Sequence, residues 1–198
     1  VSMTMAGNSI QQVCKPIAGI LTESIKKSID FNDAFAGVRK TVTATEPEFE
    51  KLQQGIRDMA KEMPETTEQI AGVMEIAGQL GIEGTNNLLA FTKTAVMLGD
   101  TTNMSSEEAS TALARFMNIT GTSTDKVSNL GSALVELGNN TATTEAEIMT
   151  MSLRLAAAGS QVGMSEADIL SFSATLSSLG INAEAGGTAF SKLMINMQ

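Results

Sequence analysis

Hydrophobic side chains recur every three or four residues along most of the chain, which is the spacing of one face of an α-helix. Residues 48–63, for example, place Leu52, Ile56, Met59 and Ala60 on one face and charged residues on the other. Later segments repeat the pattern, with apolar positions at Ile70, Val73, Met74 and Ala77; Ala109, Leu113, Phe116 and Met117; Ile169, Phe172, Leu176 and Leu179; and Phe190, Leu193, Met194 and Met197. No segment shows sustained two-residue alternation, so we predict an all-α protein.

The stretch 131–159 shows how these helices are connected. One face before the turn holds Val127, Leu130, Leu134 and Leu137, and one face after it holds Ile148, Met151, Leu155 and Ala158. Residues 137–140, Leu-Gly-Asn-Asn, predict a helix end, because Gly and Asn tolerate the left-handed conformation that closes a helix. Thr144 and Glu147 have the spacing of a capping box, which predicts the start of the next helix. The stretch therefore predicts an antiparallel helical hairpin.

Similar boundary signals recur from residue 66 onward. Side-chain caps predict four helix starts, at Thr66 with Gln69, Ser105 with Glu108, Thr144 with Glu147, and Ser165 with Asp168. Glycines predict six helix ends, at Gly81, Gly99, Gly121, Gly138, Gly159 and Gly180. Two helices occupy about 40 residues, the length of stacked helical-hairpin repeats. Identity between successive units is weak, so the pattern leaves open a compact irregular bundle and a short solenoid.

The first 45 residues form a helical lead-in. Its apolar residues recur at helical spacing and are Ile10, Val13, Ile17, Leu21, Ile25, Ile29, Phe31, Phe35 and Val38. They predict one long N-terminal helix or two, with a kink or restart at Pro16. The stripe is narrow, as in a helix that packs against a partner chain, although a helix on a membrane surface is an alternative. We divide the chain into a lead-in, 1–45, able to form a bundle with other copies, and a helical-hairpin core, 46–198.

Charge and composition narrow the choice of partners. The net charge is −9, and residues 1–43 contain five basic and three acidic residues, so the remainder carries −11. Such an acidic body argues against binding nucleic acid by phosphate neutralisation, and we expect no sequence-specific nucleic-acid partner. Aromatic residues make up only 4% of the chain, whereas it contains 13 Met. The methionines fit either surfaces that repack against several neighbours or a Met-rich helical core.

Candidate chemistry is sparse. The chain has no His and a single cysteine, Cys14, which excludes His-based catalysis, His metal ligands and an intrachain disulfide. The carboxylate pairs Glu107/Glu108 and Glu145/Glu147 lie at predicted helix N-termini, where the helix dipole favours negative charge. We therefore predict no enzymatic activity, no catalytic, cofactor-binding or metal-binding residues, and no cofactor.

Three further motifs either match no known phosphate-binding or calcium-binding site or fit a helix cap. Gly186-Gly187 lacks the Lys-Ser/Thr that follows a phosphate-binding loop, and we expect a turn or a close helix contact there. Residues 99–103 lack the ligand pattern of a calcium loop, and Asn139-Asn140 fits a helix C-cap. No apolar run approaches the roughly 18 residues of a membrane span, and no secretory signal is recognisable. Both ends lie within helical patterns, so we expect the chain to be part of a longer protein.

Several blocks follow one another in a characteristic order: Ala77-Gly-Gln-Leu-Gly-Ile82, Met104-Ser-Ser-Glu-Glu-Ala109, Leu137-Gly-Asn-Asn-Thr-Ala-Thr-Thr-Glu-Ala-Glu-Ile148, Arg154-Leu-Ala-Ala-Ala-Gly159 and Gly180-Ile-Asn-Ala-Glu-Ala-Gly-Gly-Thr188. In these blocks the chain resembles the core region of phage tail tape measure proteins, over roughly residues 35 to 198. The resemblance implies a mostly helical virion protein that is assembled in the bacterial cytoplasm, occupies the lumen of the tail tube, sets tail length and leaves ahead of the DNA. It implies contacts with other copies of the chain, the tail tube protein, tail assembly chaperones, tail-tip or baseplate proteins and, on ejection, the host membrane.

Two other functions fit the residue pattern without the resemblance. One is a scaffold or adaptor built from helical-hairpin repeats, with a groove for a peptide or protein. The other is a membrane-active helical effector.

Overall fold

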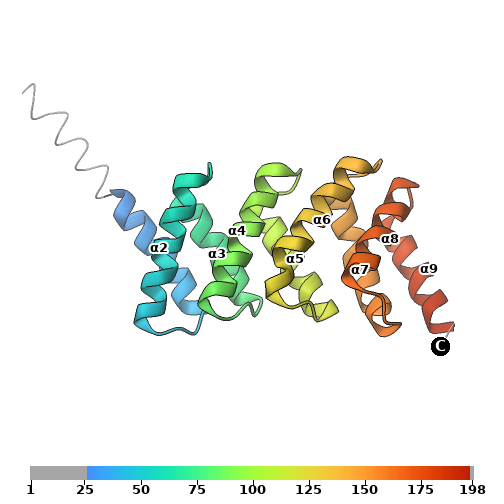
Figure 1. The fold of residues 1–198 in the computed structure, drawn as a ribbon, viewed down its shortest axis with the longest axis horizontal. Coiled ribbons are helices and arrows are strands. Elements are labelled where there is room, and N and C mark those ends of the chain that lie inside the picture. Colours follow the sequence, from blue (N-terminus) through green and yellow to red (C-terminus); the bar gives the residue numbers. More distant parts are fainter. Residues whose placement is uncertain (1–25, 197–198) are drawn as a thin grey trace, which may run out of the picture.

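The computed structural model describes residues 26–196, and its secondary structure over this range is helical without a strand (Figure 1). A leading helix covers residues 26–41. It is followed by α2 (Glu46–Glu62), α3 (Thr67–Gln79), α4 (Thr85–Thr101), α5 (Ser106–Thr120), the 3-10 helix η1 (Thr124–Lys126), α6 (Val127–Asn140), α7 (Glu145–Gln161), α8 (Glu166–Ser178) and α9 (Ala183–Asn196). The predicted all-α fold is confirmed.

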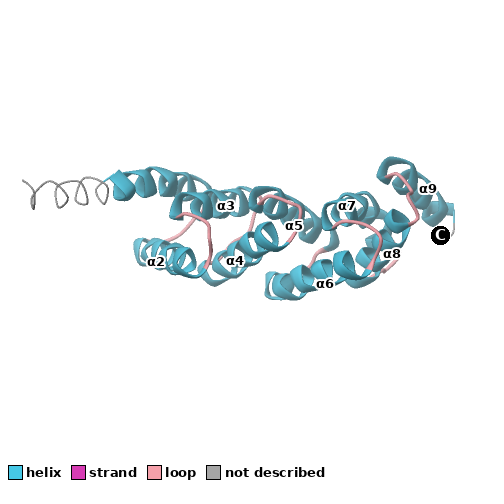
Figure 2. Ribbon diagram, turned by 90° about the horizontal axis from the view of Figure 1, so that it is seen from above, coloured by secondary structure: helices cyan, strands magenta, loops and turns pink. Residues whose placement is uncertain are grey.

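The helices form two layers that run side by side along the long axis of the molecule (Figure 2). One layer contains α2, α4, α6 and α8, and the other contains the leading helix followed by α3, α5, α7 and α9. Most helices pack both on the next helix in the chain and on the helix two places away, as α4 packs on α5 and α6. The chain is therefore an elongated short solenoid of helical hairpins, as Figure 1 shows, rather than a compact irregular bundle.

The solenoid has a regular repeat. The residues directly before α3, α5, α7 and α9 are Thr66, Ser105, Thr144 and Asn182, which are 39, 39 and 38 residues apart. In the other layer, the N-caps of α2, α4, η1 and α8 are Thr45, Gly84, Ser123 and Ser165, at spacings of 39, 39 and 42. We number repeat positions from these N-cap residues, so that position 4 is the fourth residue after the cap.

The repeat places apolar side chains at the same positions in each helix of a layer. In the layer of α2, positions 4, 7, 11 and 14 are Phe49, Leu52, Ile56 and Met59; Leu88, Phe91, Ala95 and Leu98; Val127, Leu130, Leu134 and Leu137; and Ile169, Phe172, Leu176 and Leu179. Most of these side chains are buried in one continuous core. Burial of this stripe against the facing layer, at roughly 25 cal/mol per Å² of apolar surface, is the main force that holds the hairpins together.

All four predicted capping boxes are present. The Oγ of Thr66, Ser105, Thr144 and Ser165 each accepts a hydrogen bond from the backbone N–H three residues later. A fifth capping box, Thr45 with Glu48, was not predicted from the sequence. There Glu48 Oε2 accepts hydrogen bonds from the Thr45 backbone N–H, at 2.8 Å, and from the Thr45 hydroxyl, at 2.7 Å. These caps fix where each hairpin turns, and each is typically worth about 1 kcal/mol.

Three of the six predicted glycine ends are confirmed. Gly81, Gly121 and Gly180 have φ values of +90°, +69° and +74° and follow the ends of α3, α5 and α8. The other three, at Gly99, Gly138 and Gly159, are wrong, because α4, α6 and α7 continue to Thr101, Asn140 and Gln161. No non-glycine residue between 26 and 196 has a positive φ, so Asn139 and Asn140 do not form the predicted left-handed cap. Instead Asn140 Nδ2 donates to the Glu136 carbonyl, at 2.9 Å.

The described part of the lead-in, residues 26–41, packs on the hairpins. Phe31, Phe35 and Val38 are buried in the common core, and the rings of Phe35 and Phe49 meet edge to face with centroids 6.1 Å apart. Arg39 donates two hydrogen bonds of 2.8 Å to Glu46 across the turn into α2. The predicted stripe from Ile10 to Ile25, the effect of Pro16 and the environment of Cys14 lie outside the described residues. The division of the chain at 45/46 stays a prediction.

Candidate interaction surfaces

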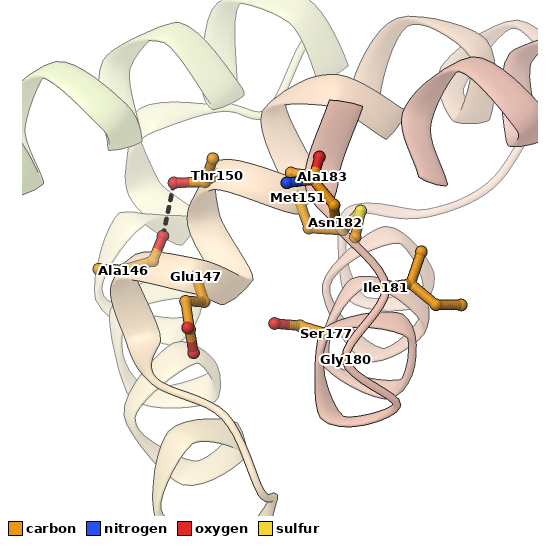
Figure 3. A pocket seen from close by; sticks show the side chains of 9 residues that line it. All are labelled: Ala146, Glu147, Thr150, Met151, Ser177, Gly180, Ile181, Asn182 and Ala183. Atoms are coloured by element: carbon orange, nitrogen blue, oxygen red, sulfur yellow. Dashed lines mark hydrogen bonds between the residues drawn. The ribbon is translucent and has the colours of Figure 1, made fainter. Parts of the chain in front are cut away.

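A groove of about 420 Å³ lies between the first turn of α7 and the connection from α8 to α9 (Figure 3). Glu147 and Thr150 border it on the α7 side, and Ser177 and Asn182 border it on the opposite side. The side chains of Met151, Ile181, Ala146 and Ala183 add apolar surface. The groove therefore combines hydroxyl, amide and carboxylate groups with an apolar wall, which suits contact with another protein segment.

The polar groups on the α7 side already have local partners. Glu147 Oε2 accepts hydrogen bonds from the Thr144 backbone N–H, at 3.0 Å, and the Thr143 hydroxyl, at 2.9 Å. The pKa of Glu147 is lowered, chiefly by the Thr144 N–H and then by the two threonine hydroxyls. Thr150 donates its hydroxyl to the Ala146 carbonyl, at 2.7 Å. A carboxylate held in its ionised form by such donors suits a cap better than a general acid.

On the opposite side of the groove, the polar groups also form hydrogen bonds at helix ends. The hydroxyls of Ser177 and Thr143 lie 2.6 Å apart, and Asn182 Oδ1 accepts the Glu184 backbone N–H at 2.8 Å, which caps α9. Ser177 is thus connected to Glu147 through Thr143. Because the pKa of Glu147 is lowered, this carboxylate is a weak base for activating a serine. The arrangement ties α8 to the start of α7.

A second groove, of about 300 Å³, lies between α4 and α6. Gly131 lines this groove, and its missing side chain lets Thr94 of α4 approach α6 closely. Leu98 and Val135 line the groove, and Met97 stands at its edge with half of its surface exposed. An exposed, flexible methionine beside an apolar groove is typical of surfaces that adapt to a protein partner.

Two carboxyl groups, those of Glu65 and Asp100, meet where the connection between α2 and α3 lies against α4 and α5. Glu65, between α2 and α3, accepts a hydrogen bond from the Ser106 hydroxyl at 3.3 Å, while its Oε2 is buried without a hydrogen-bond donor. Burial raises the pKa of Glu65, and the nearby Asp100 carboxylate raises it further. Both effects favour the protonated form of the Glu65 carboxyl group.

The remaining candidate residues from the sequence cap helices or form helix contacts. Glu108 and Glu147 complete capping boxes, and Glu107 and Glu145 lie in the same first turns. Gly186 and Gly187 form the predicted close helix contact: a Cβ at Gly187 would come within 2.7 Å of Arg154 Cβ. Between residues 26 and 196 no group of three or more Asp, Glu or Cys side chains is placed to hold a metal ion. Within the same range, every helix is too short or too polar to span a membrane.

Three residues predicted to point inward do not. Phe172, Leu179 and Leu193 are exposed, which corrects the inward faces predicted for these two helices. The helical periodicity is right, since Ile169, Phe190 and their neighbours on the same faces are buried or half-buried. The difference is that no further helix packs on α8 and α9 at this end of the described chain (Figure 1).

An elongated repeat whose polar groups serve as caps, with grooves and exposed apolar side chains, has the features of an assembly component. The family model described as phage-related minor tail protein matches residues 53–198, nearly three-quarters of the chain. The chain belongs to this family. It is therefore a structural component of a phage tail. Neither the curated proteins nor the solved structures include a match to it.

The matched region of this tail protein is the solenoid itself. It begins within α2 and extends through α9, so it includes both grooves and the carboxyl pair. The leading helix lies outside the match, although Phe31 and Phe35 share the core of the matched region.

Proposed function

We propose that this tail protein is the core region of a tape measure protein, which occupies the tail tube, sets its length and leaves it ahead of the DNA. The family membership supports a role in the tail. The repeat architecture supports a role in setting tail length, because each hairpin of about 39 residues adds a similar length to an elongated stack. The proposal rests on one observation: this member of a tail protein family is built from hairpins that stack along a single axis.

The proposed role is structural rather than enzymatic. The carboxylates of the capping boxes hold helix ends, as Glu147 does with Thr143 and Thr144. In the tail, the lead-in would associate with the lead-ins of other copies, and the hairpin solenoid would lie at the end near the tail tip. The tail tube protein, the assembly chaperones and the tip proteins are the partners that this role requires.

Ejection requires the hairpins to separate easily. Ion pairs between neighbouring helices are exposed, as in Lys93 with Glu62, at 3.4 Å, and Arg154 with Glu184, at 3.5 Å. Exposed pairs of this kind contribute at most about 1 kcal/mol each. Hairpins in a linear repeat contact only their neighbours, so the stack can open one unit at a time. This is the property expected of a protein that must pass through a narrow tube.

The ruler can be tested by removing one repeat from the protein in its phage. Deletion of residues 106–144 removes α5 and α6 and joins Ser105 to Glu145. The capping box then reforms, because Glu147 becomes the third residue after Ser105. Electron microscopy of the virions should show shorter tails, by about 58 Å if the segment is a single helix in the tube and by about 10 Å if it stays stacked.

A length-restoring variant provides the control. Replacing residues 106–144 with a second copy of residues 67–105 keeps the length, since both segments contain 39 residues from cap to cap. This variant should restore the normal tail length. Tails of unchanged length in the deletion variant would exclude the ruler while leaving a structural role in the tail.

A scaffold or adaptor within the tail is the second candidate. The groove between α4 and α6, with Met97 at its edge, supports it. In that case the deletion, which removes α6 and Gly131, should abolish assembly of the tail rather than shorten it.

A further inference from the structure

The hairpins of the solenoid meet at three junctions, which differ in the side-chain hydrogen bonds that cross them. The first junction lies between α2/α3 and α4/α5, the second between α4/α5 and α6/α7, and the third between α6/α7 and α8/α9. Because the hairpins follow one repeat, equivalent helices meet at each junction, and their contacts can be compared directly.

The first and third junctions are each crossed by several polar side-chain contacts. Within residues 26–196, those of the first junction are Ser110 to Val73, Asn118 to Leu80, Lys93 to Glu62 and Ser106 to Glu65. Those of the third junction are Lys126 to Glu166, Thr143 to Ser177 and Arg154 to Glu184. Several donors spread over two layers hold neighbouring hairpins in one relative orientation, because each hydrogen bond weakens steeply when it is misaligned.

The second junction has a single polar contact of this kind in the described part of the chain. The backbone N–H of Ala146, in α7, donates to Oδ1 of Asn103, in the connection from α4 to α5, at 3.3 Å. In the other layer, no side-chain hydrogen bond or ion pair joins α4 to α6 within residues 26–196. The hydroxyls of α4 that line the groove there donate back into their own helix, Thr94 to the Ala90 carbonyl at 3.0 Å and Thr101 to the Met97 carbonyl at 2.7 Å.

Apolar packing holds the second junction together instead. Leu98 and Val135 line the groove between α4 and α6, and a Cβ at Gly131 would come within 2.7 Å of the Thr94 methyl group. Apolar contact is not directional, so two such surfaces can rotate against each other with little loss of buried area. The second junction therefore resists separation but fixes orientation less firmly than the other two.

We propose that the second junction is a hinge, at which residues 26–121 and 124–196 change their relative orientation while the first and third junctions stay aligned. The movement would alter the width of the groove of about 300 Å³ between α4 and α6, and the flexible side chain of Met97, at its edge, can adapt to either width. Because the molecule is elongated, a small rotation at this central point displaces both of its ends (Figure 1). The inference rests on the contacts at each junction and is independent of the tape measure function.

The test measures one distance across each junction by pulsed electron paramagnetic resonance, in the full chain with Cys14→Ser. Position 6 is exposed in α2, α4, α6 and α8, where it is occupied by Lys51, Ala90, Asn129 and Ser171. Substitution to cysteine and spin labelling in the pairs 51/90, 90/129 and 129/171 places equivalent points on either side of the first, second and third junctions. We expect the distance distribution of the pair 90/129 to be about twice as broad as the other two, or to contain two peaks. Circular dichroism checks that each variant is folded.

Two matched variants test whether the hydrogen bonds set the alignment. Asn103→Ala removes the polar contact of the second junction and should broaden the 90/129 distribution further, while leaving 51/90 unchanged. Asn118→Ala removes a contact of the first junction and should broaden 51/90 instead. Three distributions of equal width, or the greatest width at the first or third junction, would overturn the proposal. Widths that neither alanine variant changes would overturn it as well, because hydrogen bonds would then not determine which junction moves.

Discussion

Gly99, in the last turn of α4, lies directly against Ser106, the first residue of α5. A Cβ added at Gly99 would come within 2.7 Å of the Ser106 backbone N and 2.8 Å of its Cα. The contact recurs along the solenoid, because Gly138 of α6 meets Glu145 of α7, and Gly159 of α7 meets Ile169 of α8. These glycines let consecutive helices of a hairpin approach each other closely where the chain turns.

Gly99→Ala should therefore destabilise the protein. The methyl group meets backbone atoms, which cannot rotate away, so α5 must shift at its capped end. Overpacking of this kind costs about 1–3 kcal/mol and outweighs the gain of about 1 kcal/mol from replacing glycine in a helix. Urea denaturation monitored by circular dichroism measures the difference.

Gly72→Ala is the matched control. Gly72 lies within α3, and a Cβ there would meet nothing within 4 Å. The substitution should stabilise the protein by about 0.5–1 kcal/mol through helix propensity alone. Equal effects at the two positions would contradict a steric role for Gly99.

The cap at Thr144 is a second point of expected sensitivity. Thr144→Ala removes the hydroxyl that accepts the Glu147 N–H, at 3.3 Å, and should cost about 1 kcal/mol. Thr150→Ala, one turn further along α7, removes only a hydroxyl that donates to a carbonyl within its own helix. Thermal denaturation should show a lower midpoint for Thr144→Ala and little change for Thr150→Ala. A midpoint unchanged by Thr144→Ala would mean that the helix start is fixed by packing instead.

The contrast between caps and glycines shows which parts of the fold the sequence can reveal. A capping box such as Thr66 with Gln69 is satisfied within one helical turn, so its residues predict the boundary by themselves. A glycine near a helix end gives no such information. Gly121 ends α5 through its own backbone conformation, whereas Gly99 serves a contact with the following helix. Only the tertiary structure separates the two roles.

Neither the regular repeat nor the grooves could be predicted from the sequence, and the reasons are related. Position 7 is Leu52, Phe91 or Leu130 in successive units, and any of these fills the core, so sequence identity between repeats stays low. The groove in Figure 3 brings Glu147 beside Ser177, whose hydroxyl reaches Thr143 from a different helix. Such proximity follows from the stacking of hairpins. The exposure of Leu179 likewise depends on whether another helix covers it, which helical periodicity does not show.

The packing of the leading helix makes a third prediction, which tests the division of the chain at residue 45. Phe35 is fully buried between the leading helix and α2, and Arg39 stacks on Phe49 with its guanidinium 4.5 Å from the ring centroid. Phe35→Ala should cost about 3–5 kcal/mol and lower the midpoint of the main unfolding transition. If the lead-in were an independent domain, calorimetry would instead show an unchanged main transition.

The carboxyl pair at Glu65 and Asp100 leads to the final prediction, which concerns pH. The pKa of Glu65 is raised above its ordinary value of 4.5, by burial first and by Asp100 second, so the folded protein binds this proton more tightly than the unfolded chain. Between the ordinary pKa and the raised one, the contribution of Glu65 to stability therefore increases as the pH falls and is lost as the pH rises. At pH values above the ordinary pKa, this shift therefore lowers the stability of the folded protein.

Glu65→Gln mimics the protonated carboxyl group at every pH. The amide can donate a hydrogen bond toward Asp100 and still accept one from Ser106, so the variant should be more stable than the natural protein at pH 7, by about 1 kcal/mol. This difference should shrink as the pH is lowered and vanish below about 4.5, where Glu65 is protonated in both states. Denaturation curves at pH 7 and pH 4 measure it, with Glu50→Gln, an exposed residue of α2, as the control. A destabilised variant at pH 7 would show that the negative charge of Glu65 stabilises the contact of the α2–α3 connection with α4 and α5.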